Sequence, residues 1–212
     1  ITKQFNKDVR IVHVQENSRT LCTTKEVLSE EKYMVELARH GQGKLIPLYA
    51  EVPELKLKGQ QAAAVAHVLT TSNRVSIIRG AAGTGKTTLM KEAIGKIEQA
   101  GKQVTVVAPT AQASRGVLKD EGFKNADTVA KLLTDQKMQQ NLKDQVLWVD
   151  EAGLLGTKDM AALLDITTRN NAQLILGGDT RQHASVVRGD ALRVLNTVAG
   201  IKTAEVSKIY RQ

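Results

Sequence analysis

Two different patterns of apolar residues follow each other along the chain. Near its start, two short alternating segments, VRIVHV and RTLCTT, flank a polar QENS and together predict a β-hairpin. A helical pattern then opens at Thr24, places Val27, Met34 and Leu37 near one face, and is expected to end at Gly41. The first part of the chain is therefore expected to be a small hairpin-plus-helix appendage.

A linker is expected from Lys44 to Lys58, because Pro47, Pro53 and the glycines just before it interrupt both patterns. We place a domain boundary here. Residues 1–56 then comprise the appendage and the linker, and residues 57–212 comprise a second, larger domain.

Beyond the linker, short and continuously apolar runs alternate with helical stretches. The runs predict strands at Val75–Arg79, Val104–Ala108, Val146–Val149, Leu174–Leu176 and Ala204–Val206. Helices are expected to start near Gln60, Lys86, Ala111, Thr157 and Asp190. Because strands that are apolar throughout and separated by helices are typical of a parallel sheet covered on both faces, the expected fold class is α/β.

One motif predicts chemistry for this sheet. The strand Val75–Arg79 runs into GAAGTGKT, residues 80–87, and then into a helix, which is the setting of a phosphate-binding loop. Glycines let backbone N–H groups turn inward around a polyphosphate, and the helix start adds partial positive charge. Lys86 is expected to reach the β- and γ-phosphates of ATP, and the Thr87 hydroxyl to hold Mg²⁺. The alternative is a glycine-rich turn without a ligand, which the strand–loop–helix setting disfavours. The expected nucleotide contacts are Gly80, Ala81, Ala82, Gly83, Thr84, Gly85, Lys86, Thr87 and Thr88.

Two further strand ends carry polar residues that suit nucleotide hydrolysis. Asp150 and Glu151 follow the apolar run Val146–Val149, so Asp150 is expected to bind Mg²⁺ and Glu151 to polarise the attacking water. Gln182 follows Leu174–Leu176 in the sequence GGDTRQ and is expected to sense the γ-phosphate. Parallel strands put all of these residues at one edge of the sheet.

The composition of the chain limits which binding partners, bonds and locations are expected. The net charge of +8 favours anionic partners, nucleic acid first, while only 3% aromatic residues disfavour extensive base stacking. Cys22 is the one cysteine, which excludes a disulfide within the chain and a cysteine zinc cluster. A reducing, cytoplasmic location is therefore expected. No apolar run reaches the roughly 18 residues of a membrane span, so no membrane insertion is expected.

The order of the motifs resembles a known family. Gln60, the loop 80–87, Pro109-Thr110, Asp150-Glu151 and GDTRQ at 178–182 occur in the order of superfamily 1 helicase motifs, with Tyr210-Arg211 at the end. The pattern is similar to the RecD-like branch. Within it, the segment LCTTKEVLSEEKYMVELARHGQGK and the runs ADTVA and VRGDALR resemble the helicase part of TraI/TrwC-type conjugative relaxases.

This resemblance implies a RecA-like ATPase domain that uses MgATP to move along single-stranded DNA, with 5′–3′ polarity, in conjugative DNA transfer. It also implies a second RecA-like domain in the same longer protein, which would close over the nucleotide, and contacts with the conjugation machinery. Two alternatives stay open. One is a fragment of a RecD-like DNA repair helicase, and the other is a non-hydrolysing module that binds DNA or a secretion channel.

The resemblance also implies individual roles. Gln60 matches an adenine-reading glutamine, with its neighbour Gln61 as the alternative, because an amide both donates and accepts. Pro109-Thr110-Ala111 and Thr128 match positions that contact the single-strand backbone, and Arg211 matches an arginine that approaches the γ-phosphate. Many RecD-like proteins carry histidine where this chain has Ala130, so that side chain's role is absent here.

Overall fold

The computed structural model describes residues 8–16, 19–80, 84–178 and 190–207. In chain order, its elements are β1 (Ile11–Glu16), β2 (Arg19–Thr24), α2 (Lys25–His40), α3 (Gly59–Thr70), β3 (Val75–Gly80), α4 (Lys86–Gln99), β4 (Val104–Ala108), η1 (Gln112–Leu118), β5 (Asp127–Thr128), α5 (Val129–Thr134), α6 (Gln136–Gln140), β6 (Val146–Val149), η2 (Ala152–Leu154), α7 (Thr157–Arg169), β7 (Gln173–Gly178), α8 (Ala191–Thr197) and β8 (Thr203–Val206). Within this part of the chain, no helix combines the length and the apolarity needed to span a membrane.

A six-stranded sheet forms the centre of the larger domain, in the order β5-β4-β6-β7-β3-β8. All of its strand pairs are parallel. The expected RecA-like α/β fold is therefore confirmed. In this order, β7 lies between β3, which leads into the phosphate loop, and β6, which ends one residue before Asp150.

Alternate side chains of the strands build two apolar layers, one on each face of the sheet. Ile77, Leu147 and Leu176 face a cluster that includes residues of α2, α5, α7 and α8. Ile78 and Trp148 face the opposite cluster, which includes residues of α3 and α4. This period of two follows from the pleat of a strand, and burial on both faces explains why the runs are apolar throughout.

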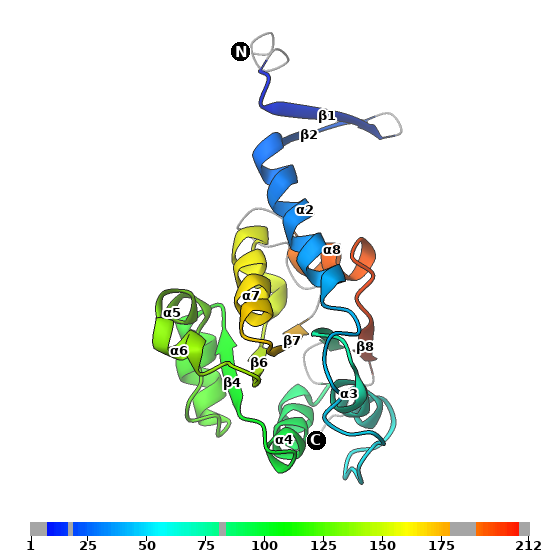
Figure 1. Cartoon of the computed structure of the whole chain (residues 1–212), viewed down its shortest axis with the longest axis vertical. Helices are drawn as coiled ribbons and strands as arrows, with labels where there is room; N and C mark the ends of the chain where they lie inside the picture. Colours follow the sequence, from blue (N-terminus) through cyan, green and yellow to red (C-terminus); the bar gives the residue numbers. More distant parts are fainter. Residues whose placement is uncertain (1–7, 17–18, 81–83, 179–189, 208–212) are drawn as a thin grey trace.

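The expected hairpin and helix at the start of the chain are confirmed. β1 and β2 pair antiparallel, and α2 runs from the Thr24 N-cap to the Gly41 C-cap. Figure 1 shows the hairpin beyond the N-terminal end of α2, while α2 itself lies along α7 and α8. Met34, Val35 and Ala38 are buried in the same apolar cluster as the sheet. The domain boundary between residues 56 and 57 stays a prediction. In its packing, however, α2 belongs to the core of the larger domain.

The segment from Gln112 to Gln140 contains elements that the apolar pattern did not predict. A helix was expected near Ala111, and η1 there is a π-helix rather than an α-helix. The strand β5 has two residues, and the short helices α5 and α6 are capped by Thr128 and Asp135, whose side chains accept backbone N–H bonds. Two-residue strands and five- or six-residue helices are too short to show a hydrophobic period.

If α2 is part of the cooperative core, shortening one of its buried side chains destabilises the whole domain. We expect Met34→Ala to lower the free energy of unfolding by about 2–5 kcal/mol, because Met34 is fully buried and the substitution leaves a cavity. Glu36→Ala, at an exposed position of the same helix, is the control. Urea unfolding followed by Trp148 fluorescence reports on the sheet, and an unchanged midpoint in Met34→Ala would contradict the assignment.

Candidate functional site: a phosphate loop and an acidic pair at the sheet edge

The phosphate loop joins the end of β3 at Gly80 to the start of α4 at Lys86. Gly85 is the N-cap of α4 and has φ +73°, a left-handed conformation that favours glycine. A Cβ at Gly85 would also lie 2.5 Å from the Gln61 amide nitrogen. The backbone conformation therefore favours glycine here, and a larger residue would also displace the Gln61 amide. Of the other expected nucleotide contacts, Ala81, Ala82 and Gly83 lie outside the described residues.

The side chain of Gln61, on α3, is hydrogen-bonded to the backbone of the phosphate loop. Its amide nitrogen donates to the Thr84 carbonyl at 2.9 Å and to the Gly85 carbonyl at 3.3 Å, and the residue is 6% exposed. Within a planar peptide unit the C=O and the following N–H point in opposite directions. Drawing these two carbonyls toward α3 therefore turns the N–H groups of Gly85 and Lys86 to the other side, where an anion would bind.

Gln60, the expected adenine reader, has different surroundings. Its exposed side chain accepts a hydrogen bond from the Ser207 N–H at 2.9 Å and donates to the Ser207 hydroxyl at 3.1 Å. The role of Gln60 in reading adenine stays a prediction. The contact between Gln61 and the loop could not be read from the sequence, because it joins residues 23 and 24 positions apart through the packing of α3.

Asp150 and Glu151 follow β6 on the same sheet edge. Gly177 lies beside Asp150, since a Cβ on Gly177 would be 3.4 Å from Asp150 Oδ1, so a glycine at the end of β7 leaves room for the carboxylate. Glu151 has φ +52°, which is left-handed and unfavourable for glutamate. Such strain persists when the surrounding structure imposes it, and it is concentrated at functional sites.

The electrostatics of the pair are those of a partly desolvated acidic site. Burial raises the pKa of Asp150, and Glu121 raises it further, whereas the Glu151 N–H and Lys86 lower it. Burial also raises the pKa of Glu151, followed by the charge of Asp150, and Lys86 again opposes this. Lys86 thus acts on both carboxylates. The loop and the acidic pair, expected from separate motifs, lie together.

One cavity connects these groups. It has a volume of about 200 Å³ and is lined by Lys86, Thr87, Asp150 and Glu151, with Glu121 as a further carboxylate. Trp148 is also at this cavity but is 2% exposed, because it packs in the apolar core on one face of the sheet. Gln182 and Arg211, the other two expected catalytic residues, lie outside the described residues.

The expected DNA contacts lie farther along the same edge, at the ends of β4 and β5. Ala108 pairs with Thr128 in the parallel register, which brings Thr128 next to Pro109-Thr110-Ala111. The two threonine hydroxyls act as caps: Thr110 accepts from the Ala113 N–H and Thr128 from the Lys131 N–H, each at 3.1 Å. Each hydroxyl keeps its proton for a further acceptor.

Charges near this end are already paired. Asp127 accepts from Lys131 Nζ at 2.5 Å and lies 3.4 Å from the Arg115 guanidinium. Burial raises the pKa of Asp127, but Lys131, the Thr128 N–H and Arg115 outweigh it, so the pKa is lowered. A DNA phosphate at this edge would therefore compete with Asp127 for these two cations.

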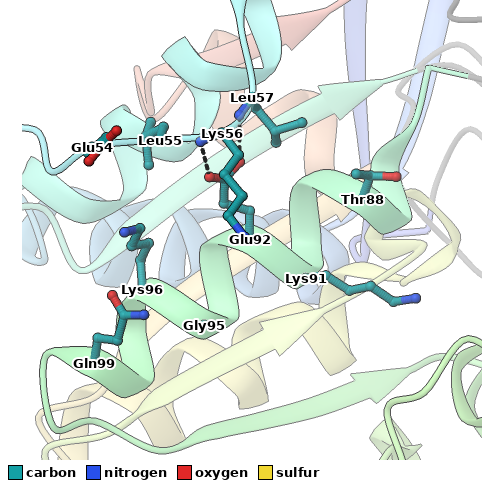
Figure 2. Close-up of a pocket in the computed structure, with 10 residues that line it drawn as sticks. All are labelled: Glu54, Leu55, Lys56, Leu57, Thr88, Lys91, Glu92, Gly95, Lys96 and Gln99. Atoms are coloured by element: carbon teal, nitrogen blue, oxygen red, sulfur yellow. Dashed lines mark hydrogen bonds between the residues drawn. The ribbon is translucent and has the colours of Figure 1, made fainter.

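A second cavity, of about 600 Å³, lies between the segment Glu54–Leu57 and α4. Figure 2 shows Thr88 at one end of it and Gln99 at the other, along the same helix. The Glu92 carboxylate accepts the backbone N–H groups of Lys56 and Leu57, which fastens the segment to α4. Because α4 begins at the phosphate loop, the end of this cavity at Thr88 lies next to the loop.

Comparison with known protein families identifies the family to which this chain belongs. A family described as an AAA domain matches residues 56–212, which includes the loop, the acidic pair and the whole six-stranded sheet. The chain belongs to this AAA-domain family. The match begins one residue before the expected start of the larger domain.

Curated relatives of this AAA domain include conjugation proteins and a helicase. The conjugal transfer protein TraA of Rhizobium radiobacter is 34% identical over 158 residues, 74% of this chain and 14% of that protein. The multifunctional conjugation protein TraI of Escherichia coli K12 is 28% identical over 91% of this chain and 12% of that protein. The RecD2 DNA helicase of Deinococcus radiodurans is 32% identical over 76% of this chain and 23% of that protein. The chain is thus confirmed to resemble RecD-like and TraI-type proteins, and it spans less than a quarter of each.

Removing the Gln61 amide tests whether it orders the phosphate loop. We expect Gln61→Ala to weaken the binding of both ADP and inorganic pyrophosphate by up to about 30-fold, because two hydrogen bonds that are worth about 1 kcal/mol each are lost. Gln140→Ala, at an exposed position of α6, is the matched control. Isothermal titration calorimetry measures both ligands. If Gln61→Ala weakened ADP but left pyrophosphate unchanged, Gln61 would act on the base instead of the loop.

Asp150 gives the fold a predictable pH dependence in the absence of metal and nucleotide. Because its pKa is raised, the folded chain holds this proton more tightly than the unfolded chain. Stability therefore falls as pH rises from about 4 through the raised pKa. We expect Asp150→Asn to raise the melting temperature at pH 8 by about 2–4 °C, or about 1 kcal/mol, and to have little effect near pH 4. Calorimetry in EDTA measures this, with exposed Asp120→Asn as control, and a pH-independent difference would contradict it.

Proposed function

We propose that this chain is an ATP-hydrolysing motor domain of a DNA helicase or translocase that acts on single-stranded DNA. The observation that carries the proposal is the meeting of Lys86, Thr87, Asp150 and Glu151 at one cavity on the carboxyl edge of a parallel sheet. The segment expected to contact DNA lies at the same edge. Nucleotide chemistry and DNA movement would then be coupled through one sheet.

The residues present fit MgATP. A Thr hydroxyl and an Asp carboxylate are hard oxygen donors of the kind that Mg²⁺ prefers. Burial raises the pKa values of Asp150 and Glu151, and Lys86 lies close enough to both carboxylates to oppose that rise. In the described part of the chain, no three His, Cys, Asp or Glu side chains form a metal cage by themselves. A cation here would therefore depend on phosphate oxygens as well, as is usual for Mg²⁺ at nucleotide sites.

Each residue then has a distinct task. Lys86 and the backbone N–H groups at the start of α4 bind the phosphate oxygens. Thr87 and Asp150 hold Mg²⁺, which neutralises charge on the phosphates when bound. Glu151, in its deprotonated form, orients the attacking water and accepts its proton. Gln182 and Arg211 are proposed to contact the γ-phosphate.

The cavity beside Thr88 is where we place the nucleoside. With the phosphates at the start of α4, the base and ribose must extend to one side of that helix. The cavity between Glu54–Leu57 and α4 begins there, has a volume of about 600 Å³ and is lined by Lys56, Lys91 and Lys96.

We propose that Pro109, Thr110, Ala111 and Thr128 contact the sugar–phosphate backbone of single-stranded DNA. Hydroxyl protons and a net charge of +8 suit phosphates, and the low aromatic content argues against binding by base stacking. Binding is therefore expected to be weakly sequence-dependent and sensitive to salt.

The names of the relatives support a role in conjugative DNA transfer. We propose in addition that movement is 5′–3′ and that the longer protein contacts the conjugation machinery. The RecD2 relative supports the alternative, a repair helicase. In either role, a second RecA-like domain of the longer protein would close over the γ-phosphate. Turnover by residues 1–212 alone is therefore expected to be slow, because a cation supplied across such a cleft is worth roughly 10³–10⁵ in rate.

Two substitutions separate binding from hydrolysis. Lys86→Ala removes the cation at the phosphates and is expected to weaken MgATP binding at least tenfold. Glu151→Gln keeps the shape but cannot accept the proton, so MgATP affinity is expected to stay within about twofold while turnover falls about 10²–10⁴-fold. Calorimetry gives the affinities, and single-turnover hydrolysis of labelled ATP, with and without single-stranded DNA, gives the rates.

Three outcomes would count against the proposal. Equal nucleotide affinity in wild type and Lys86→Ala would remove the phosphate loop as the binding site. Nucleotide binding without hydrolysis, even with single-stranded DNA and in a polypeptide extended through the second RecA-like domain, would favour the non-hydrolysing module. Hydrolysis at the wild-type rate in Glu151→Gln would remove Glu151 as the base.

A further inference from the structure

A third carboxylate lies at the proposed metal site, and no sequence motif assigned it. Glu121 lines the cavity of Lys86, Thr87 and Asp150, although it comes from the turn after η1, far from the phosphate loop in sequence. The Thr87 hydroxyl donates to Glu121 Oε1 at 2.8 Å, and the pair is half-buried. This is the hydroxyl that we expect to hold Mg²⁺.

The direction of this hydrogen bond decides what Glu121 does. A threonine hydroxyl has one proton and two lone pairs, and a carboxylate can only accept. With the proton committed to Glu121, the lone pairs of Thr87 Oγ1 point elsewhere. A metal ligand needs a lone pair, so a hydroxyl that donates to a carboxylate on one side is oriented to bind a cation on the other.

We propose that Glu121 is a positioning residue for Thr87, which fixes the hydroxyl as a ligand for the Mg²⁺ of the bound nucleotide. The proposal rests on the proposed function, since it concerns the same site. It adds a residue to the machinery and explains a contact that the phosphate-loop motif does not contain.

The π-helix explains how Glu121 reaches Thr87. An α-helix turns by about 100° per residue, and each wider π-turn takes in one residue more than an α-turn. The residues after η1 are therefore rotated about the helix axis relative to an unbroken α-helix. The Glu121 N–H still bonds to the Val117 carbonyl at 2.9 Å, so Glu121 is fixed to the last turn of the helix instead of being part of a loose loop. Wide turns of this kind occur frequently at functional sites.

The charges around the cavity also favour a cation bound near Thr87 and Glu121. Glu121, Asp150 and Glu151 surround it with three carboxylates, and Lys86 is the cation among its described lining residues. Such a site repels a metal-free polyphosphate and attracts a divalent cation. Nucleotide binding should therefore depend strongly on Mg²⁺, and Glu121 should contribute to this dependence.

The test measures ADP affinity by calorimetry on residues 1–212, once in Mg²⁺ and once in EDTA. The ratio of the two dissociation constants is the enhancement by Mg²⁺. We expect Glu121→Ala to reduce this enhancement about 10–100-fold while ADP affinity in EDTA stays the same or rises, because loss of a partner of a metal ligand weakens metal binding by that factor. Glu121→Gln should recover part of the enhancement, since its amide oxygen still accepts from Thr87. Asp120→Ala, an exposed acidic neighbour, is the control.

A double-mutant cycle tests whether Glu121 acts through Thr87. In a Thr87→Val background, Glu121→Ala should cause no further loss of the Mg²⁺ enhancement. A loss that persists there, or an equal drop of ADP affinity in Mg²⁺ and in EDTA, would overturn the positioning role. If the wild-type chain failed to bind ADP at all, the proposed function itself would fail. Normal Mg²⁺ enhancement in Glu121→Ala would remove only this inference.

Discussion

Parallel pairing of β3 with β7, and of β7 with β6, is the constraint on which the site depends. The register of these pairs determines where the three strands end relative to one another. Gly80, Gly178 and Asp150 therefore lie at one edge of the sheet, although the strand pairing and not a direct bond brings them there. The glycines at the end of β7 then let the turn after β6 approach closely, since a Cβ on Gly178 would lie 3.0 Å from the Gly153 nitrogen. The left-handed Glu151 lies in that same turn.

The sequence predicted those parts of the fold that are buried on both faces. The runs Val104–Ala108 and Val146–Val149 agree with β4 and β6 at both ends, because a strand enclosed between two helical layers is apolar over its full length. The β5–α6 region was missed for the opposite reason. Its elements are short and held by side-chain caps, so they leave no period in the sequence.

The candidate site divides in a similar way. Lys86, Thr87, Asp150 and Glu151 belong to contiguous motifs, and their positions follow from strand and helix ends alone. The contacts of Gln61 with the loop and of Glu121 with Thr87 join separate segments through packing. They depend on how α3 lies against α4 and on the wide turns of η1. No local pattern in one sequence carries that information.

The packing of α2 also affects how this domain can be isolated. The family match begins at residue 56, yet the apolar face of α2 covers α7 and α8 and shares their core. Arg39 and Gln42 add hydrogen bonds to the carbonyls of Val198 and Ala199. A polypeptide started at residue 56 would leave this surface bare to solvent, and contiguous apolar surface of that kind promotes self-association. The covering of this apolar surface thus depends on residues that lie outside the family match.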